Sequence, residues 1–213
     1  TEVLKESIVE KFEDIPTMGP EWDFRQIVKD LPKQGNLLEI GSFLGASAIA
    51  FAREFKSAKK QWNIHCVDMF RGMEALGPTP KIREYMKKFT MDEELHLKLF
   101  KKNIEKWDNI TWEKTWLGTE LEIEDYEPPF KATALFYDGD HKYQPLMRFL
   151  ESHCKNIPYL FIADYELNFK GTIKAVDEYV TKYNKQLIVL NCARWNPKIM
   201  VRFEHESPVA CIL

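Results

Sequence analysis

The chain has 213 residues, of which 45% are hydrophobic and 30% are charged. This length is typical of one domain with a full hydrophobic core, so residues 1–213 are predicted to form a single domain. A formal net charge of −3 argues against a non-specific nucleic-acid binder, and no apolar run approaches the length of a membrane span. The four cysteines form no C-x-x-C pair and no secretory signal is recognisable, so we expect a cytoplasmic protein with reduced thiols and without nucleic-acid or membrane partners.

Residues 1–34 form a polar, amphipathic segment that precedes the first predicted strand. Apolar side chains recur at helical spacing near its beginning (Leu4, Ile8 and Phe12). Proline and glycine then interrupt the pattern, and a second short helix is predicted over residues 23–31. The favoured interpretation is a helical cap on the edge of a sheet. The alternative is direct ligand contact, through a loop around Met18 and Gly19 that folds over the mouth of a ligand site.

The next stretch contains a tight glycine turn. An apolar run over residues 37–40 ends at Gly41, Gly45 follows, and residues 46–52 have helical composition. This order of strand, glycine turn and helix is typical of the start of a nucleotide-binding α/β unit. Glycine can adopt positive φ and let the backbone approach a ligand closely. The G-x-G-x-x-G dinucleotide fingerprint is absent, because Phe43 occupies the position of its second glycine.

Two carboxylates accompany this turn. Glu39 lies inside the apolar strand, where a carboxylate is costly unless donors bind it. Asp68 ends the next predicted strand, residues 62–68, at a position that suits a ribose diol.

The segment over residues 69–107 is too long for a simple crossover between two strands. It contains a Gly-Pro-rich opening and two helical patterns, which predict a helical insertion after the second strand. Two interpretations stay equally open. The insertion is either a decorated crossover with ordinary core residues or a lid over a substrate, because long insertions in α/β folds gather where ligands bind.

The remainder of the chain alternates strands and helices. Strands are predicted over residues 110–116, 132–137 and 159–163, and helices over 144–154 and 171–183. Two final strands, 187–190 and 199–203, have no helix between them and are predicted to pair as an antiparallel hairpin. The sequence therefore predicts an α/β fold with a doubly wound, mostly parallel seven-stranded sheet covered on both faces.

Acidic residues follow several of these strands: Asp68, Asp138, Asp140 and Asp164. The carboxyl ends of parallel strands share one edge of the sheet, where ligands bind, so these side chains are predicted to gather there with His141. Any one of them also suits a helix cap or a turn. Gly139 permits a sharp turn between Asp138 and Asp140.

The motifs resemble those of class I S-adenosylmethionine (SAM) methyltransferases. Within that class they are most similar to the small-molecule O-methyltransferases grouped with the macrocin and cephamycin tailoring enzymes. The matching elements are Glu39-Ile40-Gly41-Ser42 with Gly45 and Ser47, Ile64 to Gly72 around Asp68, Phe100 with Asn103, Asp138 to Tyr143, Ala163-Asp164-Tyr165, and Gly171 to Val176. One departure is Tyr165, because relatives that bind a divalent metal carry a second carboxylate or an asparagine there.

The resemblance implies a Rossmann-like fold, SAM as the cofactor and transfer of a methyl group to a small molecule. An oxygen is the favoured acceptor atom and a nitrogen the less favoured one. The glycine turn would hold the methionine end of SAM, the end of the second strand its ribose, and the turn after the third strand its adenine. The residues implied are Glu39, Gly41, Ser42, Gly45, Ser47, Asp68, Met69, Gly118 and Thr119, with Tyr137 or Asp138 near the sulfonium.

Two routes remain open for removing the acceptor proton. In one, the carboxylates of Asp138, Asp140 and Asp164 hold Mg²⁺, which acidifies the acceptor hydroxyl. In the other, His141 beside Asp138 acts as the general base, because an imidazole accepts a proton at neutral pH. We slightly favour a weakly held metal with His141 beside it.

Two other functions are kept as alternatives. The first is an NAD-linked oxidoreductase on a similar fold, which the missing dinucleotide fingerprint disfavours. The second is a non-catalytic partner subunit with a SAM-binding fold. The sequence leaves both the acceptor and self-association open, including a homo-oligomer.

Overall fold

The structure is a computed structural model that describes residues 24–71, 92–115, 126–166, 169–192 and 207–213. Several parts of the sequence prediction lie outside these residues: the helical pattern near the start of the chain, the loop around Met18, residues 72–91 of the insertion, the turn at Gly118 and Thr119, and the strand over residues 199–203.

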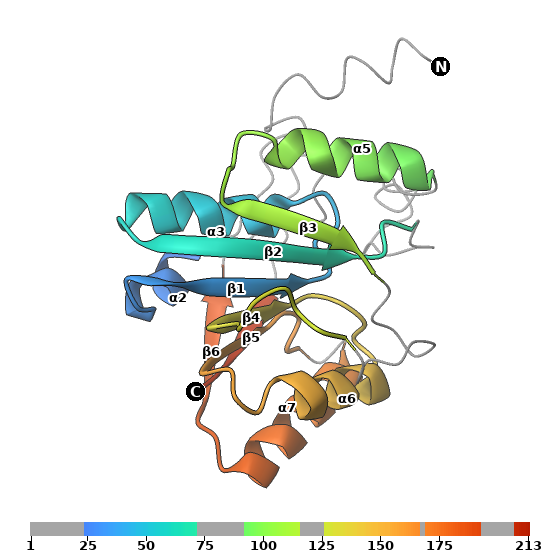
Figure 1. The fold of residues 1–213 in the computed structure, drawn as a ribbon. Helices are drawn as coiled ribbons and strands as arrows, with labels where there is room; N and C mark the ends of the chain where they lie inside the picture. Colours follow the sequence, from blue (N-terminus) through green and yellow to red (C-terminus); the bar gives the residue numbers. More distant parts are fainter. Residues whose placement is uncertain (1–23, 72–91, 116–125, 167–168, 193–206) are drawn as a thin grey trace.

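One sheet of seven strands organises the described part of the chain (Figure 1). Its strands are β1 (Gln34–Ile40), β2 (Gln61–Asp68), β3 (Ile110–Lys114), β4 (Ala134–Tyr137), β5 (Tyr159–Ile162), β6 (Leu187–Cys192) and β7 (Ser207–Ile212). The helices are α2 (Arg25–Asp30), α3 (Ala46–Ser57), α5 (Glu93–Ile104), α6 (Tyr143–His153) and α7 (Lys170–Tyr183).

The strand order is β3-β2-β1-β4-β5-β7-β6. The first five of these strands are parallel to one another, and β7 is antiparallel to both β5 and β6. The predicted fold class is therefore confirmed: a doubly wound, mostly parallel sheet that ends in an antiparallel pair. The order reverses at β1, which lies between β2 and β4. In such sheets ligands bind outside the carboxyl ends of the strands at this switch point.

The described partner of β6 lies further along the chain than the predicted strand over residues 199–203, which is outside the described residues. β6 pairs with residues 207–212, in a register that places Leu187 opposite Ile212 and Cys192 opposite Ser207. Val209 and Ala210 are fully buried, because β7 lies inside the sheet between β5 and β6. A short run that begins beside Pro208 is a weak strand pattern by itself. The position of this strand is set by β5 and β6, whose backbone groups hydrogen-bond to it on both sides.

Each face of the sheet carries its own apolar core. On one face α2, α3 and α5 pack over the strands, and the Phe24 and Phe51 rings stack with centroids 3.9 Å apart. On the other face α6 and α7 pack over β4 and β5 through Phe149, Leu146 and Tyr179. A parallel sheet buries both faces in this way, which explains its almost continuous apolar strands. No helix among the described residues has the length and apolar character needed to cross a lipid bilayer.

Helix α5 is the described helix of the predicted insertion after the second strand. The Asp92 carboxylate accepts a hydrogen bond from the Leu95 amide at 3.0 Å and so caps the helix. Glu93 and Glu94 lie in its first turn and lysines in its last, which suits the helix dipole. Residues 72–91 lie outside the description, so the lid interpretation stays a prediction.

Candidate functional site

The glycine turn joins the carboxyl end of β1 to α3. Gly41 and Gly45 have φ of 85° and 87°, as the sequence predicted for a turn that only glycine forms easily. A Cβ on Gly41 would lie 2.2 Å from the carbonyl oxygen of Asp138, and one on Gly45 would lie 3.1 Å from Ile104. The close approaches that require these glycines are therefore to β4 and α5, in addition to any ligand. Helix α3 starts directly after Gly45, and no side chain caps its first turn.

We expect Gly41→Ala to be strongly destabilising. The substitution combines a positive φ, which costs an L residue about 1–2 kcal/mol, with a contact to the Asp138 backbone that cannot yield without moving β4. Thermal unfolding followed by circular dichroism measures the loss. Gly139→Ala is the matched control, because its Cβ would lie 3.2 Å from the Tyr137 ring and no positive φ is required. Equal melting temperatures for the two variants would contradict this account of Gly41.

The Asp68 carboxylate fastens the glycine turn to the end of β2. Its Oδ2 accepts a hydrogen bond from the Phe43 amide at 2.7 Å, and its Oδ1 accepts one from the Phe70 amide at 2.7 Å. Each carboxylate oxygen has two lone pairs, so one on each remains for a further donor. Asp68 thus shapes the turn, a role that sequence reasoning missed, and keeps acceptor capacity at the switch point.

Glu39 is a fully buried carboxylate beneath this turn. Its Oε2 accepts a hydrogen bond from the Cys66 thiol at 3.2 Å, on the neighbouring strand. Burial raises the pKa of Glu39, and the nearby hydroxyls of Ser47 and Ser42 oppose the rise. No atom of the described residues, however, hydrogen-bonds to Oε1 with good geometry. An orphaned buried oxygen is costly, and a donor from a bound ligand would relieve that cost.

A second group of polar side chains lies at the carboxyl ends of β4 and β5. The His141 Nε2 is 3.4 Å from the Asp164 Oδ2 and 3.9 Å from the Asp138 Oδ1. One ligand atom from each of the three residues lies within 4.8 Å of the others. The Phe169 ring lies against the imidazole, with centroids 4.5 Å apart. Two carboxylates and an imidazole in this arrangement can bind a divalent cation or share a proton.

Asp140, the third carboxylate of the sequence prediction, is not part of this group. Its Oδ1 accepts a hydrogen bond from the Lys142 amide at 2.9 Å, and its Oδ2 lies 3.5 Å from the Lys142 ammonium. The carboxylate thereby shapes the turn that leads into α6, as aspartate commonly does. The structure brings Asp138, His141 and Asp164 together and places Asp140 beside them in a local turn.

Of the other predicted residues, Gly118 and Thr119 lie outside the described part of the chain. Ser42 and Ser47 are buried around Glu39, and Met69 follows Asp68 at the end of β2. Sequence reasoning missed Cys66 and His96. Cys66 lies opposite Glu39 in the register of β1 and β2, so strand pairing is the signal that would have found it. No motif marks His96.

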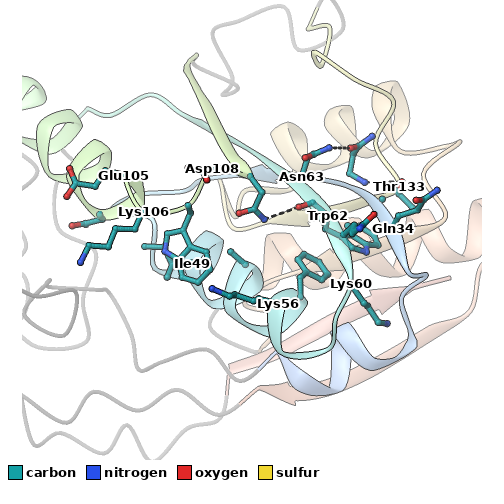
Figure 2. Close-up of a pocket in the computed structure, with 18 of the residues that line it drawn as sticks. Gln34, Ile49, Lys56, Lys60, Trp62, Asn63, Glu105, Lys106, Asp108 and Thr133 are labelled. Carbon is teal, nitrogen blue, oxygen red and sulfur yellow. Dashed lines mark hydrogen bonds between the residues drawn. The ribbon is translucent and has the colours of Figure 1, made fainter.

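A cavity of about 1220 Å³ lies elsewhere, at the amino ends of β1 and β2 (Figure 2). Trp62, Ile49 and Lys56 line it. The Lys60 ammonium, also at this cavity, is engaged by carbonyl oxygens of Val28, Lys29 and Leu31 at the end of α2. The cavity therefore lies toward the amino ends of the strands, whereas the glycine turn lies at their carboxyl ends. None of the predicted site residues lines it.

No family model and no curated protein matches the chain. Solved structures do resemble it. The O-methyltransferase NovP is 18% identical with a TM-score of 0.55, over 97% of this chain and 78% of NovP. Fibrillarin from Aeropyrum pernix, solved with bound SAM, is 11% identical with a TM-score of 0.52, over 89% of this chain and 73% of that chain. The O-methyltransferase from Bacillus cereus, in complex with S-adenosylhomocysteine (SAH), is 13% identical with a TM-score of 0.50, over 89% of this chain and 79% of that chain.

At sequence identities of 11–18%, the similarity to these structures establishes the fold of the chain and nothing more. The chain has the Rossmann-like fold that these methyltransferases share, which confirms the fold that its motifs imply. The narrower resemblance to the macrocin and cephamycin tailoring enzymes stays a prediction.

Proposed function

We propose that the protein is a SAM-dependent methyltransferase that transfers the methyl group to an oxygen of a small-molecule acceptor. The observation that carries the proposal is the buried carboxylate of Glu39, whose Oε1 has no hydrogen-bond partner among the described residues. It lies beneath a glycine turn at the switch point of a methyltransferase fold. A cofactor with a cationic amino group supplies the donor that such an oxygen lacks.

The residues of the turn fit the cofactor. Glu39 would face the amino group of its methionine part, and the open start of α3 offers backbone N–H groups to the carboxylate. The remaining lone pairs of Asp68 suit the two ribose hydroxyls. The cofactor supplies an electrophilic methyl group on its sulfonium. The protein positions the acceptor in line with that methyl group and removes the acceptor's proton.

The group of Asp138, His141 and Asp164 suits the proton step. An imidazole between two carboxylates can take up the proton of an acceptor hydroxyl, and the carboxylates stabilise the positive charge that it gains. The same three residues also fit a divalent cation, which would supply Lewis-acid polarisation of the hydroxyl when bound. Both routes use residues at the ends of β4 and β5, adjacent to the glycine turn through the contact of Gly41 with Asp138.

Ligand titration tests the proposal. We expect SAH, measured by isothermal titration calorimetry, to bind one site per chain, and NAD to show no binding under the same conditions. The difference arises because the turn has Phe43 in place of the glycine that a dinucleotide pyrophosphate needs. Binding of NAD without binding of SAH would instead support the oxidoreductase alternative.

The acceptor class needs a separate experiment. Fibrillarin from Methanococcus jannaschii, a similar structure with a TM-score of 0.51, is a pre-rRNA processing protein. Small-molecule extracts and total RNA should therefore be incubated in parallel with the protein and SAM carrying a deuterated methyl group. We expect mass spectrometry to find the label in a small molecule, in keeping with the net charge of −3. Label in RNA would overturn the small-molecule part, and SAH binding without any transfer would favour the non-catalytic subunit. A cytoplasmic location and a homo-oligomer stay predictions.

A further inference from the structure

Phe43 has an unusual backbone conformation at the centre of the glycine turn. Its φ is 50°, in the left-handed region, although it carries a bulky side chain. Residues with a Cβ rarely adopt this region, and they persist there only when surrounding contacts hold them. The glycines at positions 41 and 45 adopt positive φ without this cost. Phe43 is therefore the residue of the turn that needs to be held.

Side chains from two other elements hold the backbone on both sides of Phe43. Its amide donates to the Asp68 Oδ2 at 2.7 Å, at the end of β2. Its carbonyl oxygen is 3.0 Å from the Nε2 of His96, on α5. The following carbonyl, that of Leu44, accepts a hydrogen bond from the Asn103 side chain at 2.8 Å. Three side chains thus fix three consecutive peptide groups, and we refer to Asp68, His96 and Asn103 as the turn clamp.

The surroundings of His96 determine which of its ring nitrogens carries the hydrogen. A carbonyl oxygen can only accept, so the Nε2 of His96 must carry the hydrogen. The side chain is 1% exposed, and burial lowers its pKa while the Asp68 carboxylate opposes the shift. The Phe43 and Phe70 rings contact the imidazole edge to face, with centroids 5.1 and 5.5 Å away. Its Nδ1 has no hydrogen-bond partner among the described residues. Among the described residues, the imidazole therefore hydrogen-bonds only to the Phe43 carbonyl.

We propose that His96 is a positioning residue for the cofactor: its Nε2–H holds Phe43 in the left-handed conformation and so pre-organises the glycine turn for SAM. The inference rests on the proposed function, since it concerns the same turn. A loop that is already ordered loses less conformational freedom on binding, and this raises its affinity. Without the His96 hydrogen bond, Phe43 can relax toward negative φ, and the turn must be reordered each time the cofactor binds.

Two amide variants of His96 distinguish the bond from simple packing. His96→Gln can place its side-chain amide nitrogen near the position of Nε2, whereas the shorter His96→Asn places its amide near Nδ1. We expect SAH affinity to remain within about threefold of wild type in His96→Gln and to fall roughly five- to tenfold in His96→Asn, the range of one net hydrogen bond. Equal affinities of the two variants would overturn the assignment.

The same substitution in a Phe43→Gly protein distinguishes positioning of Phe43 from docking of α5. In a Phe43→Gly protein the left-handed conformation needs no clamp, so His96→Asn should change SAH affinity by less than about twofold there. If His96 acts only by docking α5, the loss in affinity will be the same in both backgrounds, and the proposal fails. Melting temperatures of all variants report the packing contribution separately.

Hydrogen exchange tests the clamp without any ligand. The Phe43 amide, bonded to Asp68, should exchange faster in His96→Asn than in wild type or His96→Gln. If wild-type protein binds no SAH while this pattern appears, the proposed function fails and the clamp stands. If SAH binds and exchange is the same in all three proteins, the clamp fails and the proposed function stands.

Discussion

Replacing Asp68 by alanine should lower the affinity for SAH at least tenfold in a protein that still folds. The substitution removes the acceptor that we propose for the ribose hydroxyls and leaves the amides of Phe43 and Phe70 without their partner. A hydrogen bond to a charged group contributes about 1.5–3 kcal/mol, and a tenfold change in affinity corresponds to about 1.4 kcal/mol. Calorimetric titration of SAH, with circular dichroism as the check on folding, measures the effect. Unchanged affinity in folded Asp68→Ala protein would refute the cofactor assignment.

The structure makes a second comparison necessary, because Asp68 has two roles that the alanine variant removes together. An SAH analogue that lacks both ribose hydroxyls separates them. If Asp68 binds the ribose, the analogue should bind wild type more weakly than SAH does, whereas Asp68→Ala should bind both ligands equally. If Asp68 only holds the turn, the ratio between the two ligands will be the same in both proteins.

Replacing His141 by alanine should lower kcat for methyl transfer by roughly 10²–10⁴-fold, the usual contribution of a general base. The imidazole lies between Asp138 and Asp164, and no other imidazole among the described residues lies in this group. The same variant should retain SAH affinity, since the methionine and ribose contacts proposed for the cofactor involve other residues. Asp140→Asn is the matched control, and its loss should be far smaller because the Asp140 carboxylate serves the turn into α6.

Assays with and without excess EDTA decide whether a cation takes part. We expect activity to fall in EDTA and to return with Mg²⁺ or Mn²⁺, because the carboxylates of Asp138 and Asp164, which lie beside the imidazole, suit a divalent ion. Full activity in EDTA, together with the large loss in His141→Ala, would exclude our metal and leave the histidine as base. A loss in EDTA that Mg²⁺ restores, with His141→Ala nearly normal, would assign proton removal to the metal site instead.

The sequence by itself determined the fold class and the location of the candidate site. Apolar runs, helical periodicity and the glycines of the turn at residues 41–45 are local signals, because the backbone conformation that each requires depends on near neighbours. Alternation of strands and helices then predicts a parallel sheet, and a parallel sheet brings its carboxyl ends to one edge. Asp68, Asp138 and Asp164 were predicted there for this reason.

Only the tertiary structure decided which partners these residues meet. Strand pairing placed Cys66 against Glu39, and it placed residues 207–212 beside β6. The packing of α5 on the turn brought His96 to the Phe43 carbonyl, although 53 positions separate them in the chain. Such contacts depend on how elements distant in sequence pack together. A local pattern that marks a strand or a helix does not specify which atom of a neighbouring element its side chains will reach.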